Sequence, residues 1–261
     1  MGIALAARLS TLAGGAALKP HADWIIPDWP VATRVKALIT TRAGGLSHGP
    51  YTSFNLGTHV GDDPDAVSHN RERLRAVLPG DPVWLHQVHG TQVIDAATAS
   101  GIPTADAAYC RVRHVVCGVL TADCMPVLLA ARDGSVVAVA HAGWRGMAAG
   151  VIEATLSQMK IAAEDTLAYL GPSIGPAAFE VGPDVLTAFA ETDSESRVAF
   201  EPKGEGKYHA DLYALARRRL MRAGLREIHG GSFCTYEQSD RFYSYRREKT
   251  TGRMASLIWI D

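Results

Sequence analysis

Two nearly continuous apolar runs, joined by the dipeptide Asp133-Gly134, constrain the fold of this chain more than any other feature. The runs are PVLLAAR (126–132) and SVVAVAHA (135–142), and Asp-Gly between such runs is the strongest short signal for a β-hairpin with a two-residue turn. This turn pairs Arg132 with Ser135 and thereby fixes the register of the whole hairpin. Both faces of the paired strands are apolar, so we expect further layers to cover the sheet on both sides.

A thiol and an imidazole lie at the open end of this predicted hairpin. Cys124 precedes the first run and His141 lies near the end of the second. In the predicted register Cys124 faces Gly143 and His141 faces Pro126, so both side chains point to the same face. Diagonal neighbours on one face lie about 7 Å apart. We therefore expect the two side chains to converge on one ion or one substrate atom.

The segment WLHQVHG (84–90) offers a further imidazole, from His86 or His89. Residues three apart on a strand point to opposite faces, so at most one is expected to join the site, and the spacing leaves the choice open. A cysteine and two histidines around an open fourth position can hold catalytic zinc. Taken alone, a histidine is more often a surface residue and a free cysteine a buried, inert one. The combination favours a Zn²⁺ site, which Cu²⁺ could also occupy.

Candidate substrate-binding groups lie close to these ligands. Gly143 and Gly146 flank Trp144-Arg145 where a strand passes into a helix, and the amide end of a helix can bind an anion. Arg145 and Arg42 are candidates for binding phosphate, and Asp123 for orienting a ligand or relaying a proton. Each also has a plainer interpretation, as a surface or structural arginine or as an aspartate that caps the backbone.

The rest of the chain alternates short strands with helices. Helices are predicted over 64–78, from Gly146 through 151–159, over 184–192, and over 211–223 with Asp211 as the N-cap. Strands are predicted over 35–41, 83–88, 91–95, 114–122, 167–171, 242–247 and 255–260. No repeat or Pro/Ser-rich linker divides the sequence, so we expect a single domain of the α/β (α+β) class over 24–261.

Charge and cysteine content limit the binding partners and the cellular compartment expected for this chain. A net charge of -1 with both signs scattered along the chain gives no electrostatic footprint for nucleic acid or an anionic membrane. The four cysteines contain no CxxC pair, so free thiols in the cytoplasm are expected. Residues 1–23 are apolar and Ala-rich, but Arg8 interrupts them and no basic segment precedes them, so a flexible extension is favoured over a signal peptide. No later run approaches the roughly 18 apolar residues of a membrane span.

Five motifs then occur in order, and together they resemble one family over 24–260. They are HQVHG, TADCMPVLL, HAGWRGMAAGVIEAT, LGPSIGPAAFEVG and SYRREKTTGRMAS. They are similar to the laccase-domain family, whose bacterial members have been called polyphenol oxidases, purine nucleoside phosphorylases and peptidoglycan editing factors. The resemblance implies an α/β/β/α sandwich with mixed sheets and a metal site formed by His89, Cys124 and His141, which chooses His89 over His86.

The same resemblance implies an activity. It implies phosphorolysis of adenosine, guanosine or inosine, cleavage of methylthioadenosine, and deamination of adenosine. A three-ligand Zn²⁺ site suits both reactions, because zinc can polarise an oxygen or lower the pKa of bound water. The signature of the zinc nucleobase deaminases, H-x-E with P-C-x-x-C, is absent from the sequence, so a deamination here needs a different constellation.

Three other functions compete with this one. Cys124 and His141 alone could form the thiolate-imidazole pair of a cysteine hydrolase or amidase, for instance one that edits a peptidoglycan precursor, and such an enzyme could tolerate the loss of His89. A polyphenol oxidase with a multinuclear copper cluster needs many imidazoles in His-x-His pairs, and the sequence has none, so copper oxidation is expected at most as a side activity. A metal-storage module would bind metal without turnover.

Overall fold

The computed structural model describes residues 19–261, so most of the predicted extension 1–23 lies outside the described residues. One sheet is formed by β1 (Val35–Ile39), β2 (Pro82–Val83), β5 (Val116–Thr121) and β13 (Met254–Ile260). A larger sheet is formed by β3 (Val93–Asp95), β4 (Ala107–Cys110), β6 (Met125–Ala131), β7 (Val137–Ala142), β8 (Thr166–Leu170) and β12 (Glu227–Gly230). A small third sheet is formed by β9 (Glu180–Val181), β10 (Phe200–Gly204) and β11 (Lys207–Ala210).

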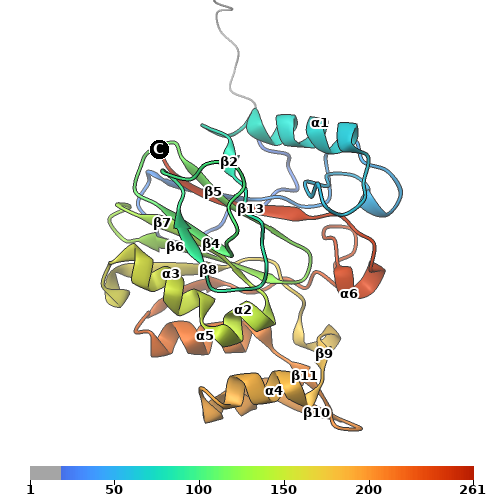
Figure 1. The fold of residues 1–261 in the computed structure, drawn as a ribbon, viewed down its shortest axis with the longest axis vertical. Coiled ribbons are helices and arrows are strands. Elements are labelled where there is room, and N and C mark those ends of the chain that lie inside the picture. Colours follow the sequence, from blue (N-terminus) through green and yellow to red (C-terminus); the bar gives the residue numbers. More distant parts are fainter. Residues whose placement is uncertain (1–18) are drawn as a thin grey trace, which may run out of the picture.

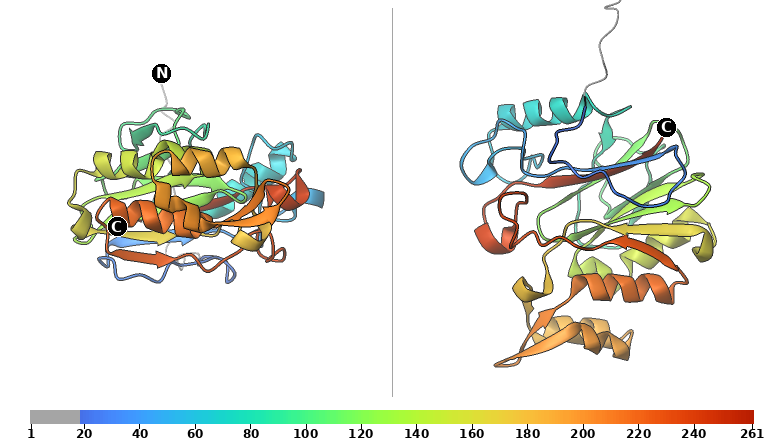
Figure 2. Two further views of the ribbon diagram at one scale, coloured as in Figure 1. Left: turned by 90° about the horizontal axis from the view of Figure 1, so that it is seen from below. Right: turned by 180° about the vertical axis from the view of Figure 1, so that it is seen from behind.

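Both large sheets mix parallel and antiparallel pairs. The four-stranded sheet has the order β1-β13-β5-β2, with only β2 parallel to its neighbour. The six-stranded sheet has the order β12-β8-β6-β7-β4-β3, with parallel pairs at its two edges. The two sheets stack face to face, with helices outside them (Figure 1; Figure 2). This arrangement is the predicted α/β/β/α sandwich with mixed sheets.

The β6–β7 hairpin has the predicted register and is buried on both faces. Pro126 pairs with His141, and Leu128 pairs with Val139. Leu128 and Val139 belong to the core between the two sheets, together with Ile258 of β13. The opposite face of the hairpin belongs to a second core, beneath helices. Alternation of side chains along each strand thus feeds two separate apolar layers.

The helices cover the two outer faces. α1 (Pro64–Arg75) packs on the four-stranded sheet, whereas the six-stranded sheet is covered by α2 (Trp144–Ala149), α3 (Val151–Met159) and α5 (Leu212–Arg222), with α4 (Pro183–Ala190) beside the third sheet (Figure 1). The helix predicted from Gly146 is two helices, because Gly150 adopts φ 102° between them and so breaks the helical path. Within residues 19–261, no helix combines the length and apolarity needed to cross a membrane.

Several predicted strands differ from the structure. Segment 242–247 is no strand: it leads into the short helix α6 (Tyr245–Glu248), whose N-cap Ser244 accepts a hydrogen bond from the amide of Arg247. Hydrogen bonds from Arg247 to the carbonyls of Thr235 and Tyr236, outside this segment, override the β-propensity of the aromatic run. The strand predicted over 83–88 is reduced to Pro82–Val83. Strands β4, β9, β10, β11 and β12 were not predicted.

Candidate metal centre and its pocket

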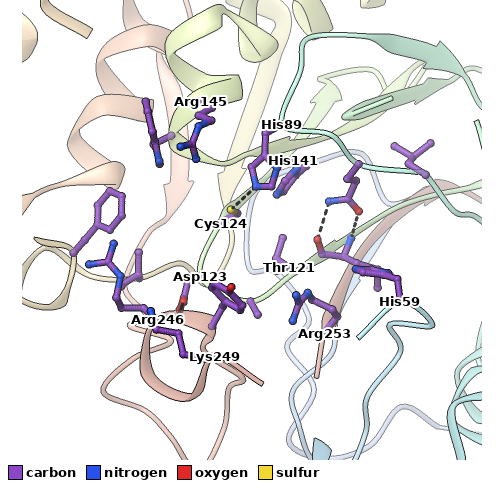
Figure 3. Close-up of a pocket in the computed structure, with 18 of the residues that line it drawn as sticks. His59, His89, Thr121, Asp123, Cys124, His141, Arg145, Arg246, Lys249 and Arg253 are labelled. Carbon is purple, nitrogen blue, oxygen red and sulfur yellow. Dashed lines mark hydrogen bonds between the residues drawn. The ribbon is translucent and has the colours of Figure 1, made fainter. Parts of the chain in front are cut away.

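The candidate centre lies at one end of the sandwich, where the chain crosses from one sheet to the other. Cys124 ends the link between β5 and β6, and His141 lies in β7 opposite Pro126. His89 lies in the loop after β2 and adopts φ 60°. All three line a cavity of about 730 Å³ (Figure 3). The structure therefore brings together the three predicted ligands from distant parts of the sequence.

The three ligand atoms have the spacing that a small cation requires. The side-chain ligand atoms of His89, Cys124 and His141 all lie within 4.8 Å of one another. Cys124 Sγ lies 3.7 Å from His89 Nε2. Tetrahedral zinc with ordinary Zn–S and Zn–N bonds places a sulfur and a nitrogen ligand about 3.6 Å apart. His141 is buried whereas His89 is exposed, so the fourth side of such a site faces the cavity.

Asp106 is a buried carboxylate that the sequence did not single out. One of its oxygens, Oδ1, lies 2.8 Å from Nδ1 of His141 and accepts the amide of His89 at 2.9 Å. The other, Oδ2, accepts the amides of Val88 and Gly90. Asp106 therefore holds both the ring of one ligand and the backbone of another, the usual arrangement behind a metal-binding histidine.

The electrostatics of the centre favour a thiolate. Burial raises the pKa of the Cys124 thiol, but the charge of His141 and hydrogen bonds with His141 and His89 outweigh burial and lower the pKa to about 6. Burial lowers the pKa of the His141 imidazole, but the negative charge of Cys124 and the bond to Asp106 raise it to about 9. A thiolate is both the metal-binding and the nucleophilic form of cysteine, so the metal-free pair is charged near neutral pH.

Gly143 provides the space in which two of the ligands meet. A Cβ atom at this position would lie 2.8 Å from Cys124 Sγ and 3.0 Å from His89 Cδ2. Both distances are shorter than van der Waals contact, so a larger residue would displace a ligand. Gly143 also precedes α2 as its N-cap, and this turn carries Trp144 and Arg145 into the cavity wall.

Two of the three predicted substrate-binding residues line the cavity. Arg145 lines the cavity, with its guanidinium 4.4 Å from the centre of the Trp144 ring. Asp123 also lines it, but its carboxylate already accepts hydrogen bonds from the Thr235 hydroxyl and the Arg246 amide, both at 2.6 Å. The roles predicted for both remain predictions.

Arg42 is not brought to the cavity. It is absent from the lining, and its guanidinium binds the carbonyls of Thr52 and Ser239 and the carboxylate of Glu248. The hydrogen bonds position a loop, which matches the plainer interpretation of this arginine as structural.

Other basic residues line the cavity instead. Arg246 and Lys249 come from α6 and the residue that ends it, and Arg253 precedes β13. Their segment, SYRREKTTGRMAS, is one of the five family motifs, but its spacing alone predicts no role in the site. Their signal was a segment with four cations within eight residues, 246–253, and it became informative only when the fold placed this segment beside Cys124.

A family model described as multi-copper polyphenol oxidoreductase laccase matches residues 36–261. The chain belongs to this family. It is 52% identical to purine nucleoside phosphorylase YfiH of Escherichia coli over 90% of this chain and 98% of that protein. It is 50% identical to purine nucleoside phosphorylase PA4543 of Pseudomonas aeruginosa over 91% of this chain and 98% of that protein. The resemblance to the laccase-domain family noted from the motifs is thus confirmed.

Solved structures of this family share the fold. Protein NMB0706 of Neisseria meningitidis superposes with a TM-score of 0.89 at 52% identity, covering 92% of this chain and 99% of that chain. YlmD of Geobacillus stearothermophilus superposes with a TM-score of 0.81 at 33% identity, covering 87% and 92%. The family description names several coppers, yet residues 19–261 contain one cluster of three or more His, Cys, Asp or Glu residues that is suited to a metal.

Proposed function

We propose that this protein is a zinc-dependent purine nucleoside phosphorylase. The observation that carries the proposal is the convergence of His89, Cys124 and His141 on the open side of a cavity of about 730 Å³. A cavity of this size matches the range of small-molecule sites. Relatives at about half identity bear the name purine nucleoside phosphorylase. A Cys/His/His set with one open position is typical of catalytic Zn²⁺. A single copper ion in this site would not form the multinuclear cluster that reduces oxygen.

The proposed reaction exchanges one bond for another at the sugar. An oxygen of inorganic phosphate bonds to C1′ of the ribose, and the C1′–N9 bond breaks with its electron pair passing to the purine, which then takes up a proton. The bound ion would supply Lewis acidity. Asp106 fixes the ring of His141 and the loop of His89, and Trp144 and Phe179 give the cavity flat walls for a base.

The proposed substrates are adenosine, inosine, guanosine and methylthioadenosine, and we include deamination of adenosine. In deamination, water replaces the amino group at C6 of the purine and ammonia leaves. The same ion could serve both reactions, since each develops negative charge on an oxygen or nitrogen beside an open coordination position. The sequence lacks the deaminase signature motif, so it offers no separate zinc deaminase site of that type. We therefore assign both activities to the centre formed by His89, Cys124 and His141.

The decisive experiment incubates metal-analysed protein with inosine and with adenosine, with and without phosphate. We expect about one zinc per chain, free base with ribose 1-phosphate only when phosphate is present, and ammonia from adenosine. Cys124→Ala and His141→Ala should abolish cleavage while circular dichroism stays unchanged. Phosphate-independent release of base would contradict phosphorolysis, and absence of ammonia would remove the deaminase activity alone.

A cysteine hydrolase is the second candidate, favoured by the charged pair of Cys124 and His141. The thiolate would attack a carbonyl carbon, as expected for an amidase acting on a peptidoglycan precursor. His89 discriminates between the two: His89→Ala should abolish a reaction that depends on the metal and spare one that depends on the pair. Copper loading followed by an assay with a phenol tests the remaining alternative, a weak oxidase side activity.

We further propose a cytoplasmic location. All four cysteines, Cys110, Cys117, Cys124 and Cys234, are free thiols in the structure, and free thiols persist in reducing compartments. The proposed partners are purine nucleosides and phosphate, which are small molecules of that compartment. Fractionation of cells that produce the protein, with antibody detection, tests this location.

A further inference from the structure

The cavity wall opposite the metal ligands is strongly basic, although the chain as a whole has a net charge of -1. Three Lys or Arg residues, Arg246, Lys249 and Arg253, line this wall, and Arg145 lies on the side of the ligands (Figure 3). The lining contains one carboxylate, that of Asp123. Asp123 already accepts hydrogen bonds from Thr235 and Arg246. A concave surface lined by one sign of charge concentrates ligands of the opposite sign, so this wall favours an anion.

Hydrogen bonds and packing on the side away from the cavity hold Arg253 in place and leave two nitrogens of its guanidinium without a hydrogen-bond partner in the described part of the chain. Its backbone amide donates to Asn55 Oδ1 at 2.8 Å, and Asn55 is fully buried and accepts the Gly57 amide as well. A Cβ on Gly57 would lie 2.8 Å from Arg253 Cγ, so this glycine makes room for the arginine stem. Nη1 donates to two carbonyls of its own loop, whereas Nε and Nη2 have no hydrogen-bond partner among residues 19–261.

A second cation, Lys249, lies near the same aromatic ring as Arg253. The Arg253 guanidinium is 6.0 Å and Lys249 Nζ is 5.6 Å from the centre of the Tyr245 ring. Neither cation forms an ion pair with a carboxylate in the described part of the chain. Figure 3 shows both on the side of the cavity that faces Cys124 and His89. Burial lowers the pKa of Arg253, and the opposing effects of the nearby Cys124 and Asp123 are smaller.

We infer that Arg253, assisted by Lys249, binds inorganic phosphate on the wall opposite His89, Cys124 and His141. Phosphate is the co-substrate of the proposed function, on which this inference rests. Nε and Nη2 of an arginine form a planar fork that matches two oxygens of a phosphate. The metal ligands and the arginine then bracket the space between them, where the ribose would lie. Arg42 and Arg145 are not needed for this role.

The test uses the zinc-loaded, full-length protein at constant ionic strength, with inosine and inorganic phosphate as substrates. Arg253→Met should raise KM for phosphate at least tenfold and leave KM for inosine within threefold, because one charge-assisted bidentate contact is lost. Arg253→Lys should have a KM for phosphate between those of the wild type and Arg253→Met, since lysine keeps the charge but lacks the planar pair of donors. Lys249→Met should raise the phosphate KM by a smaller factor. Arg73→Gln, on the exposed face of α1, is the matched control and should change neither constant.

A binding measurement separates this inference from the proposed function. Equilibrium dialysis with radiolabelled phosphate, without nucleoside, should show binding to the wild type and to Arg73→Gln and its loss in Arg253→Met. If phosphate binds through Arg253 but no nucleoside is cleaved, the phosphorylase proposal fails and the phosphate site stands. Phosphate-dependent cleavage with an unchanged phosphate KM in Arg253→Met would overturn the site and leave the function. If Arg253→Met fails to fold, unchanged phosphate constants in both Arg253→Lys and Lys249→Met would overturn it.

Discussion

At the scale of single residues, Asp106 connects two of the proposed metal ligands without belonging to the proposed ligand set itself. Its carboxylate accepts the amides of Val88, His89 and Gly90 and lies 2.8 Å from His141 Nδ1. The pKa of this carboxyl is lowered despite burial, chiefly by the bond to His141 and that to the Gly90 amide. A charged oxygen at this place keeps the proton of the imidazole on Nδ1 and leaves Nε2 for a cation.

We expect Asp106→Asn to weaken zinc binding by 10- to 100-fold, roughly the effect seen when such supporting groups are removed. The amide keeps the size of the side chain but loses the charge and one acceptor. Competition with a chromogenic chelator measures the affinity. Asp95→Asn is the control, because Asp95 also accepts a backbone amide, that of Ala97, but does not contact the centre. Equal zinc affinity in both variants would show that Asp106 acts only on the fold.

Gly143→Ala tests whether the ligand cluster depends on missing side-chain volume. The added methyl would lie 2.8 Å from Cys124 Sγ and 3.0 Å from His89 Cδ2, so we expect at least a tenfold loss of zinc affinity with little change in the stability of the metal-free protein. Gly90→Ala is a matched control beside the centre, because its Cβ would meet nothing nearer than 3.5 Å. If both variants bind zinc like the wild type, the ligands have more freedom than the structure indicates.

The sequence predicted which three side chains converge, but it did not predict the carboxylate that supports them. Cys124 and His141 followed from one hairpin register, because a local turn fixes which side chains share a face. His89 was selected by the family motif, since spacing left His86 open. Asp106 went unnoticed although the tripeptide Thr-Ala-Asp occurs at 104–106 and again at 121–123. Its role depends on contacts with His89 and His141, which lie far from it in the sequence, and no local sequence pattern predicts such contacts.

At the scale of elements, predictions succeeded where one local signal dominated. The hairpin has an Asp-Gly turn, and α5 begins after Asp211, whose side chain accepts the amide of Ala214 as predicted for an N-cap. The strand predicted over 242–247 is wrong because Arg247 binds the carbonyls of Thr235 and Tyr236, which lie outside the segment from which the prediction was made. The same failure concealed α6, so the basic wall could not be placed in the cavity from sequence.

The cap of α5 offers a stability prediction at this scale. Asp211 Oδ1 accepts the Ala214 amide at 2.9 Å, and α5 packs on the core beneath the six-stranded sheet. Asp211→Ala should therefore lower the free energy of unfolding by about 0.5–2 kcal/mol, measured by urea titration. Asp240→Ala, at an exposed loop position, should change it by less than about 0.5 kcal/mol. A similar loss in both would mean that general charge, rather than the cap, is responsible.

At the scale of the whole molecule, the candidate metal centre joins parts of the chain that belong to different layers. Cys124 closes the crossing from the four-stranded to the six-stranded sheet, His141 belongs to the six-stranded sheet, and His89 follows β2 of the four-stranded sheet. The core between the sheets draws on strands of both. We propose on this ground that residues 24–261 form one domain, since neither sheet can bury its inner face alone.

Removal of the metal should therefore destabilise the molecule as a whole. At a zinc concentration a hundredfold above Kd, binding to the folded state alone contributes about 2.7 kcal/mol, and at roughly 2–4 °C per kcal/mol for a chain of this size the midpoint Tm should fall by about 5–10 °C on chelation. Scanning calorimetry with and without a chelator measures this, and re-addition of zinc should restore Tm. Cys124→Ser, which lacks the thiolate, should start with the lower Tm and respond little to the chelator. An equal fall in that variant would show that the chelator acts elsewhere, and His89, Cys124 and His141 would then not hold the ion that stabilises the fold.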